Sequence, residues 1–187
     1  GDWLTLHYGD AETIIDKPPL MMWLMAASFR LFNVNEFAAS MWHSLLAVLT
    51  VFITFLIGKE LFDEGTAFLS SLILITSAQF FYQGRSPLQD IPLTFFITAS
   101  LYTFILYDRK RNILFYYLTP IFIALAVLTK GPVGLALPAL IILLYILIER
   151  RQLFDSLTEY LIHIPLSIFI FMLIAAPWFI CLLYTSD

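Results

Sequence analysis

Lone basic residues stand beside helix-breaking residues at three places in the sequence. The three segments are Asp16-Lys17-Pro18-Pro19, Gly84-Arg85-Ser86-Pro87 and Thr129-Lys130-Gly131-Pro132. An arginine side chain can fork onto phosphate oxygens, and a lysine offers a compact point charge to the same group. Acids accompany two of the cations, because Asp16 precedes Lys17 and Asp90 follows Arg85 by five residues. If the three breaks meet, they form one polar pocket suited to a phosphate.

Each of these residues also has a simpler interpretation. A single Lys or Arg at a helix end commonly extends to the lipid head groups. Asp90 fits a helix N-cap or a first-turn acid as well as it fits an acid that reaches hydroxyl groups or a metal in the pocket. Anchoring cations need no neighbouring Pro-Pro or Gly-Pro, however, and three such breaks together favour a shared pocket.

The composition is that of a membrane protein. The 187 residues are 60% hydrophobic and only 13% charged, with a mean hydropathy of +0.87, whereas soluble domains carry about 25% charged residues. This excludes a single water-soluble domain and also a disordered chain. The net charge of −4 provides no basic surface for nucleic acid. Cys181 is the single cysteine, and packing is the simpler interpretation of His43 and His163.

Apolar runs predict about six membrane spans, since a spanning helix needs about 20 residues. The expected spans are 37–58, 66–84, 91–107, 113–129, 133–148 and 160–184, the last with kinks at Pro165 and Pro177. The run 113–148 would be about 54 Å long as one helix, against a hydrocarbon core of about 30 Å. We therefore expect the Lys130-Gly131-Pro132 segment to break it.

Residues 20–32 are apolar but too few to cross, and they predict a helix at the membrane interface. Residues 1–17 are mixed and polar, and predict a loop outside the membrane. The domain organisation is thus an outer loop with an interfacial helix (1–36) followed by the spans (37–187). The chain begins with Gly1 and ends soon after an apolar run, so we expect a piece of a larger protein that lacks its first span and C-terminal part.

Basic residues in the turns predict the orientation. Six of the ten lie in alternate turns, at Lys59, Arg109, Lys110, Arg111, Arg150 and Arg151. These turns are expected to face the cytoplasm. Lys17, Arg85 and Lys130 then lie on the outer side.

Four segments in this order resemble the dolichyl-phosphate-mannose–protein mannosyltransferase superfamily. They read DKPPLMMWLMAASFR, GRSPLQDIPLTFFI, LTKGPVGLALPALI and APWFI. The likeness is greatest to the bacterial branch that includes the lipid A 4-amino-4-deoxy-L-arabinose transferase. It implies an all-α integral membrane protein, a polytopic helix bundle of the GT-C glycosyltransferase type.

The resemblance also implies a function. Such enzymes move a sugar from a polyprenyl-phosphate carrier to a lipid or protein acceptor, here on the outer face of a bacterial inner membrane. No cofactor is required to supply energy, because the carrier phosphate is the leaving group. Whether the enzyme uses a divalent metal ion is left open by the resemblance. The implied partners are the carrier-linked sugar, the acceptor and the bilayer, with no nucleic acid.

The family pattern assigns roles to particular residues. Lys17 falls on the lysine that contacts the carrier phosphate, and Asp16 falls where some relatives have an acid near a metal. Arg85 is the arginine and Asp90 the aspartate of the family pattern Arg-x-x-x-x-Asp-x-Pro-Leu. Lys130 belongs to the Lys-Gly-Pro break. We expect Lys17 and Arg85 to stabilise the leaving phosphate and Asp90 to orient a substrate. The catalytic base of the family lies upstream of this chain, so the 187 residues alone are expected to be inactive.

Two other classes of protein remain as alternatives. A transporter or flippase for a lipid-linked or anionic substrate also uses broken helices and charges at one face, although the sequence lacks the paired interrupted segments of an inverted repeat. A structural membrane subunit would leave the three breaks without a purpose. An acidic pair on a preceding outer loop would favour the transferase.

Overall fold

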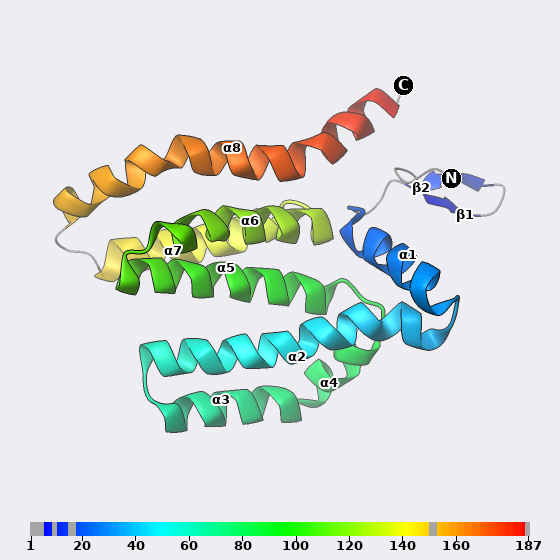
Figure 1. The fold of residues 1–187 in the computed structure, drawn as a ribbon, viewed down its shortest axis with the longest axis horizontal. Coiled ribbons are helices and arrows are strands. Elements are labelled where there is room, and N and C mark those ends of the chain that lie inside the picture. The colour runs from blue at the N-terminus through cyan, green and yellow to red at the C-terminus, as the bar shows by residue number, and fades with distance from the viewer. Residues whose placement is uncertain (1–5, 9–10, 15–17, 150–152, 186–187) are drawn as a thin grey trace.

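The computed structural model describes residues 6–8, 11–14, 18–149 and 153–185. The helices in this part of the chain are α1 (Leu20–Phe32), α2 (Glu36–Leu61), α3 (Glu64–Thr76), α4 (Ala78–Arg85), α5 (Asp90–Lys110), α6 (Ile113–Lys130), α7 (Val133–Glu149) and α8 (Leu153–Thr185). α1 coincides with the short helix predicted from the sequence. The all-helical bundle is therefore confirmed (Figure 1).

The predicted loop 1–17 contains a small hairpin, which corrects that prediction. β1 (Leu6–Tyr8) and β2 (Ala11–Ile14) pair as antiparallel strands. The β-branched Thr13 and Ile14 in the second strand favour an extended backbone.

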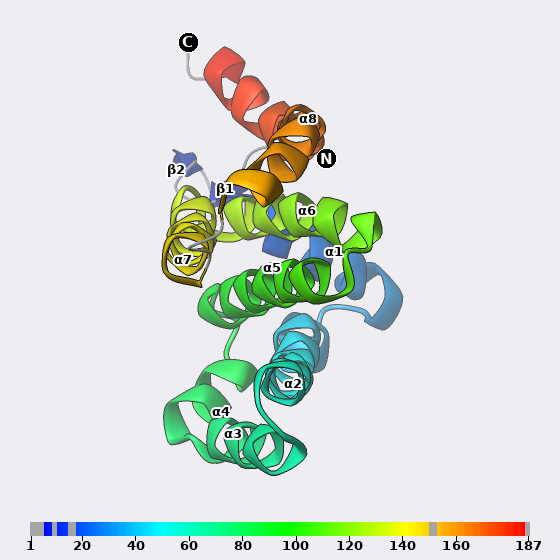
Figure 2. The same ribbon diagram turned by 90° about the vertical axis from the view of Figure 1, so that its left-hand side faces the viewer.

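The helices lie in successive layers with α5 at the centre. Figure 2 shows α3 and α4 at one edge, then α2, α5, the pair α6 and α7, and α8 at the other edge. α5 packs most extensively against α6 and also contacts α2 and α7. Its burial follows from this position: Ile91, Phe96 and Tyr107 are all less than 9% exposed. A helix that is apolar around its whole circumference is stable only when neighbours cover it.

Within the described residues, four helical segments are long and apolar enough to cross a membrane: α2, α5, α6 and residues 162–181 of α8. α3 and α4 are long and apolar enough only when taken together, and they are bent by 63° where they meet. The apolar segment Val133–Ile148 of α7 corresponds to the remaining predicted span and is slightly shorter than these segments. α8 continues through Pro165 and Pro177 and curves along its length (Figure 1).

The bend between α3 and α4 was not predicted. Ser77 leaves the helical conformation, with φ −64° and ψ 119°, and the hydroxyl of Thr76 donates to the carbonyl oxygen of Leu72 at 2.7 Å. Hydroxyl side chains that bond to nearby backbone groups weaken a helix in this way. The predicted span 66–84 is therefore two helices that meet at Ser77.

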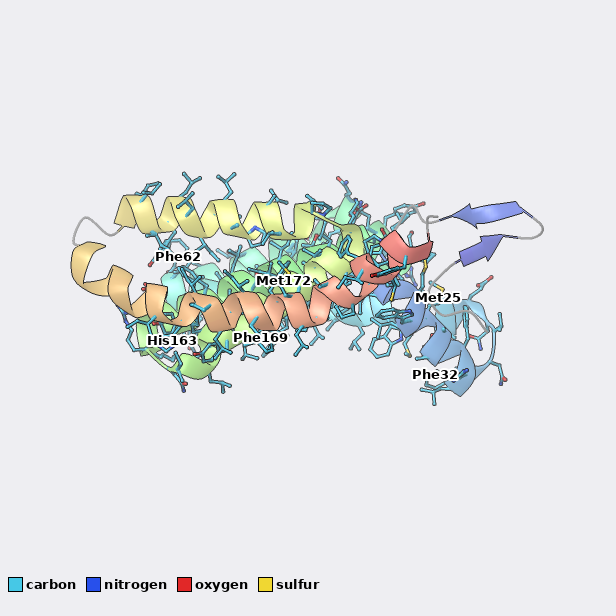
Figure 3. All side chains as sticks on the ribbon, turned by 90° about the horizontal axis from the view of Figure 1, so that it is seen from above. Met25, Phe32, Phe62, His163, Phe169 and Met172 are labelled. Atoms are coloured by element: carbon cyan, nitrogen blue, oxygen red, sulfur yellow. The ribbon has the colours of Figure 1, made fainter. Side chains whose placement is uncertain are left out.

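Exposed apolar side chains cover the flanks of the bundle. On α8, Phe169 is 61% exposed and Met172 is 52% exposed (Figure 3). On α2, Val48 is 64% exposed. A surface this apolar suits hydrocarbon and not water.

The two ends of the bundle carry different charged residues. One end holds the α2–α3 and α5–α6 turns, with Lys59 and 109–111 (Figure 1). Asp63 caps α3 there: its carboxylate accepts from the Thr66 N–H at 3.0 Å and from the Thr66 hydroxyl at 2.7 Å. These bonds hold the pKa of Asp63 below its usual value. The opposite end holds Arg85, Asp90 and Lys130. The sequence predicted this placement of Arg85 and Lys130 at the end away from the basic turns.

A close approach joins α2 to α3. A Cβ atom placed on Gly58 would lie 2.6 Å from the Cα atom of Ala67, a distance that no real pair of carbon atoms adopts without movement of the backbone. Ala67 itself is fully buried. Only glycine at position 58 allows the two helices to pack this closely.

We predict that Gly58→Ala destabilises the α2–α3 pair. The added methyl group must push Ala67 and its backbone away, and overpacking of this kind lowers the unfolding free energy by about 1–3 kcal/mol. Denaturant unfolding of the full-length protein in detergent measures the change. Ala139→Val, which adds bulk at an exposed position of α7, is the control. Equal stability of the two variants would contradict the close approach.

Candidate functional site

An ion pair at one end of the bundle joins two of the predicted site residues. The Lys130 ammonium group donates a hydrogen bond to the Asp90 carboxylate. Asp90 begins α5 and Lys130 ends α6, and these neighbouring helices run antiparallel, so the start of one lies beside the end of the other (Figure 1). The two side chains remain 40% and 45% exposed.

The local structure at Asp90 directs its carboxylate away from its own helix. Gln89 occupies the N-cap position, and no side-chain bond caps the helix there. Asp90 is thus a first-turn acid, as one interpretation of the sequence had it, but its carboxylate contacts Lys130. Ile91 and Pro92, both buried, anchor the turn, and the Thr94 hydroxyl donates to the Asp90 carbonyl oxygen at 2.8 Å.

The predicted break after Lys130 is confirmed. Gly131 has a φ of +80°, a left-handed conformation that glycine adopts without strain. Its N–H donates to the Val127 carbonyl oxygen at 2.7 Å and closes α6, while the N–H of Gly134 donates to the Gly131 carbonyl oxygen at 3.0 Å as α7 begins. A Cβ atom on Gly134 would lie 2.4 Å from the backbone of Ala126. The turn is therefore tight, and it holds Lys130 at the helix end.

The Asp90–Lys130 pair has no net charge, whereas the sequence analysis treated Lys130 as a lone cation. An isolated Lys130 would attract phosphate strongly, but Asp90 compensates that charge. A pair this exposed gains only about 0–1 kcal/mol from its mutual attraction in water. Either partner can therefore exchange its contact for one with a ligand, and the site offers both an acceptor and a donor of hydrogen bonds.

Arg85 lies at the same end but faces a different part of the structure. It ends α4, and its guanidinium carbon is 5.2 Å from the ring centroid of Phe81. No contact reported for the described residues joins Arg85 to Asp90 or Lys130. The structure thus brings Asp90 and Lys130 together as an ion pair, while Arg85 borders a groove between α2 and α4.

Lys17 and Asp16, the other two residues predicted for the site, lie outside the described residues. They directly precede Pro18 and Pro19, which are both buried where α1 starts. α1 packs against α2 and also contacts α6. Figure 1 shows α1 beginning near the Lys130 end of α6.

A cleft bordered by several hydroxyl-bearing residues, including Thr94 one turn after Asp90, was missed in the sequence. It has a volume of about 600 Å³ and lies between α2, α3 and α5. Its hydroxyl residues are Thr50, Thr54, Ser70, Ser77, Thr94 and Thr98. The Thr98 hydroxyl donates to the Thr94 carbonyl oxygen at 2.7 Å, and this oxygen can still accept a hydrogen bond. The spacing of Asp90, Thr94 and Thr98 by four residues was the signal that could have revealed this face.

The histidines take packing roles, as expected. The His163 Nδ1 atom and the Tyr117 hydroxyl are hydrogen bonded at 2.8 Å and join α8 to α6. His43 is 1% exposed within α2. Within the described part of the chain, no group of three His, Cys, Asp or Glu residues is placed to hold a metal ion.

These features define a class of protein: a polytopic helical membrane protein with a polar, ion-paired site where its helices break near the head groups. Residues 16–180 match the family described as dolichyl-phosphate-mannose-protein mannosyltransferase. The chain belongs to this family.

Curated relatives agree with the bacterial branch expected from the sequence. An uncharacterized protein of Aquifex aeolicus is 37% identical over 153 residues, which are 81% of this chain and 30% of that protein. The undecaprenyl phosphate-alpha-4-amino-4-deoxy-L-arabinose arabinosyl transferase of Pectobacterium carotovorum is 29% identical over 95% of this chain and 32% of that protein. The chain thus spans about a third of the length of these relatives.

Solved structures confirm the GT-C type of fold. The crystal structure of ArnT from Cupriavidus metallidurans bound to undecaprenyl phosphate matches the whole chain, with a TM-score of 0.87 and 23% identity, over 35% of that structure. The apo state of the same protein matches 96% of this chain with a TM-score of 0.84.

We predict weak energetic coupling between Asp90 and Lys130. A double-mutant cycle of Asp90→Asn and Lys130→Met in the full-length protein should give a coupling energy of unfolding of about 1 kcal/mol or less, because both side chains reach water. The control cycle combines Asp90→Asn with Lys110→Met, at the opposite end of α5, and should show no coupling. A value above about 3 kcal/mol would indicate a desolvated pair and contradict the exposed site.

Proposed function

We propose that the chain forms part of a membrane glycosyltransferase that moves a sugar from a polyprenyl-phosphate carrier to a lipid or protein acceptor. Membership of the mannosyltransferase family supports this, as does the likeness to relatives named for an undecaprenyl-phosphate-linked amino sugar. The observation that carries the proposal is the Asp90–Lys130 pair, which stands at two helix ends within reach of both the bilayer surface and water.

The transfer step proceeds by displacement at the sugar. The acceptor hydroxyl attacks C1 and loses its proton to a base outside this chain. The bond between C1 and the phosphate oxygen breaks, and the carrier leaves as polyprenyl phosphate. Lys17 contacts that phosphate and stabilises the charge that develops on it. A single displacement inverts the configuration at C1.

Asp90 and Lys130 orient the substrates. The Asp90 carboxylate accepts hydrogen bonds from sugar or acceptor hydroxyls, and Lys130 holds the carboxylate in position. Arg85 is the other cation predicted for the carrier phosphate, but its contact with Phe81 turns it toward the groove beside α2. We therefore leave Arg85 out of the transfer step.

The reaction needs no cofactor for energy, because cleavage of the carrier bond drives it. Asp16 remains our candidate ligand for a divalent ion, which would bind near the carrier phosphate. We place the protein in the bacterial inner membrane with the Asp90–Lys130 end toward the periplasm. The basic turns at the other end of the bundle support that orientation.

A transfer assay tests the proposal. Full-length protein is incubated with a panel of undecaprenyl-phosphate-linked sugars and with lipid A as acceptor. We expect release of undecaprenyl phosphate together with a glycosylated acceptor. Movement of the carrier-linked sugar across a vesicle membrane with no new glycosidic bond would instead establish the transporter alternative.

Substitutions at the site should abolish transfer without loss of the fold. We predict that Lys17→Ala and Asp90→Asn each lower the transfer rate by at least about 100-fold, the scale seen when one electrostatic contact to a reacting group is removed. Glu64→Gln, an exposed acid at the opposite end of the bundle, is the matched control and should retain activity. Normal transfer by a well-expressed Lys17→Ala protein would remove Lys17 from the site.

A further inference from the structure

A groove separate from the Asp90–Lys130 pair lies on the face formed by α2, α3 and α4. It has a volume of about 280 Å³, near the lower end of ligand sites in proteins, about 300 Å³. Its walls are apolar apart from Ser44 and Arg85. The remaining lining residues are Ala47, Val48, Val51, Ile75, Phe80, Phe81 and Gly84.

Close packing of α4 on α2 builds the groove. The Ser44 hydroxyl donates to the Gly84 carbonyl oxygen at 3.1 Å. A Cβ atom on Gly84 would lie only 3.1 Å from the Cβ atom of Ala47, so the two helices touch at this point. Gly84 therefore carries the next residue, Arg85, to the mouth of the groove, where the guanidinium group lies over Phe81 at 5.2 Å. The 63° bend at Ser77 turns α4 into this position.

The groove extends from the helix ends toward the middle of the bundle. Ser44 lies beside Gly84 at the outer end, and Val51 lies beside Ser71 of α3. Seven residues of α2 separate Ser44 from Val51, a length of about 10 Å at 1.5 Å per residue. Val48 and Ile75, which line this stretch, are 64% and 49% exposed. The groove is thus open to surrounding lipid along its apolar length.

We propose that this groove binds an anionic phospholipid of the surrounding bilayer. The phosphate group contacts Arg85, whose planar guanidinium group can donate two parallel hydrogen bonds to phosphate oxygens. The first part of one acyl chain lies along Val48, Val51 and Ile75. The positive mouth and the apolar walls complement the two parts of such a lipid, and basic pockets between membrane helices bind lipid head groups in this way.

The geometry favours a phospholipid over the polyprenyl-phosphate carrier of the proposed function. No contact reported for the described residues links Arg85 to the Asp90–Lys130 pair, and the groove accommodates only about 10 Å of chain. Arg85 stands at a helix end, the level at which bilayer phosphates lie. The lipid site does not depend on the transferase activity, since it requires only the α2–α3–α4 arrangement.

Native mass spectrometry of the full-length protein tests the site. The protein is released from nanodiscs that contain equal amounts of phosphatidylglycerol and phosphatidylcholine, and the lipids retained are counted. We expect one phosphatidylglycerol to be retained in preference. Arg85→Gln should lower its retention at least five-fold, and Arg85→Lys should lower it less, because an ammonium group lacks the forked geometry.

Two further variants separate the groove from a simple surface charge. Val48→Phe keeps Arg85 but fills the groove at an exposed, fold-tolerant position, and it should also lower phosphatidylglycerol retention at least five-fold. Arg109→Gln removes an exposed arginine at the opposite end of the bundle and should leave retention unchanged. An unaffected Val48→Phe protein would mean that Arg85 only contacts the general head-group layer, and would overturn the proposal.

Competition identifies the occupant. Undecaprenyl phosphate added to the nanodiscs should leave the retained phosphatidylglycerol in place, and so should millimolar inorganic phosphate. If undecaprenyl phosphate displaced the phosphatidylglycerol, and Arg85→Gln abolished this effect, the groove would be assigned to the carrier. That result would overturn the phospholipid proposal. Equal retention of phosphatidylcholine would show that charge plays no part and would overturn it as well.

Discussion

The antiparallel packing of α5 against α6 is the constraint on which the rest of the structure depends. α5 is buried by neighbours on both sides, so its ends fix where the surrounding helices must begin and end. Backbone groups that leave a helix inside hydrocarbon find no water to bond with, and breaks are therefore tolerated only at the ends or within protein. Pairing the start of α5 with the end of α6 brings the Gln89–Asp90 turn and the Lys130–Gly131 turn to the same membrane surface. The site is a consequence of where this pair of helices can stop.

The sequence predicted most of the helices because their boundaries are marked by particular residues. Gly131 and Pro132 mark the end of α6, and the structure breaks there. The bend at Ser77 carries no such mark: it lies in the run Thr76-Ser77-Ala78, and hydroxyl residues inside an apolar run are also compatible with a straight helix. The span expected over 133–148 appears as α7, which begins just after Pro132 and is the shortest of the predicted spans that form one continuous helix. Local residue types thus located the breaks that involve glycine and proline and missed the one that does not.

Contacts between distant residues account for what the sequence could not predict at the site. Arg85, Asp90 and Lys130 were expected to share one end of the bundle, and they do, because alternating spans determine which end a turn occupies. Which of them face one another depends on rotation about each helix axis. For α4 that rotation is set by the contact of Gly84 with Ser44 and Ala47, forty residues away in the chain. No spacing within the sequence encodes it, so the division between the Asp90–Lys130 pair and Arg85 emerges only from packing.

A neutral, partly exposed ion pair suits the role proposed for Asp90 and Lys130, which is to orient hydroxyl-bearing substrates. A lone lysine at the membrane surface would hold any phosphate, including those of the abundant bilayer lipids. With Asp90 as its partner, Lys130 gains from a new ligand only if that ligand also satisfies the carboxylate, as hydroxyl-rich sugars do and simple phosphates do not. Arg85 has no carboxylate among its reported contacts and lies over Phe81. The two cations thus differ in that Lys130 is balanced by an acid and Arg85 lies over an aromatic ring, which is the physical basis for the different ligands that we propose for them.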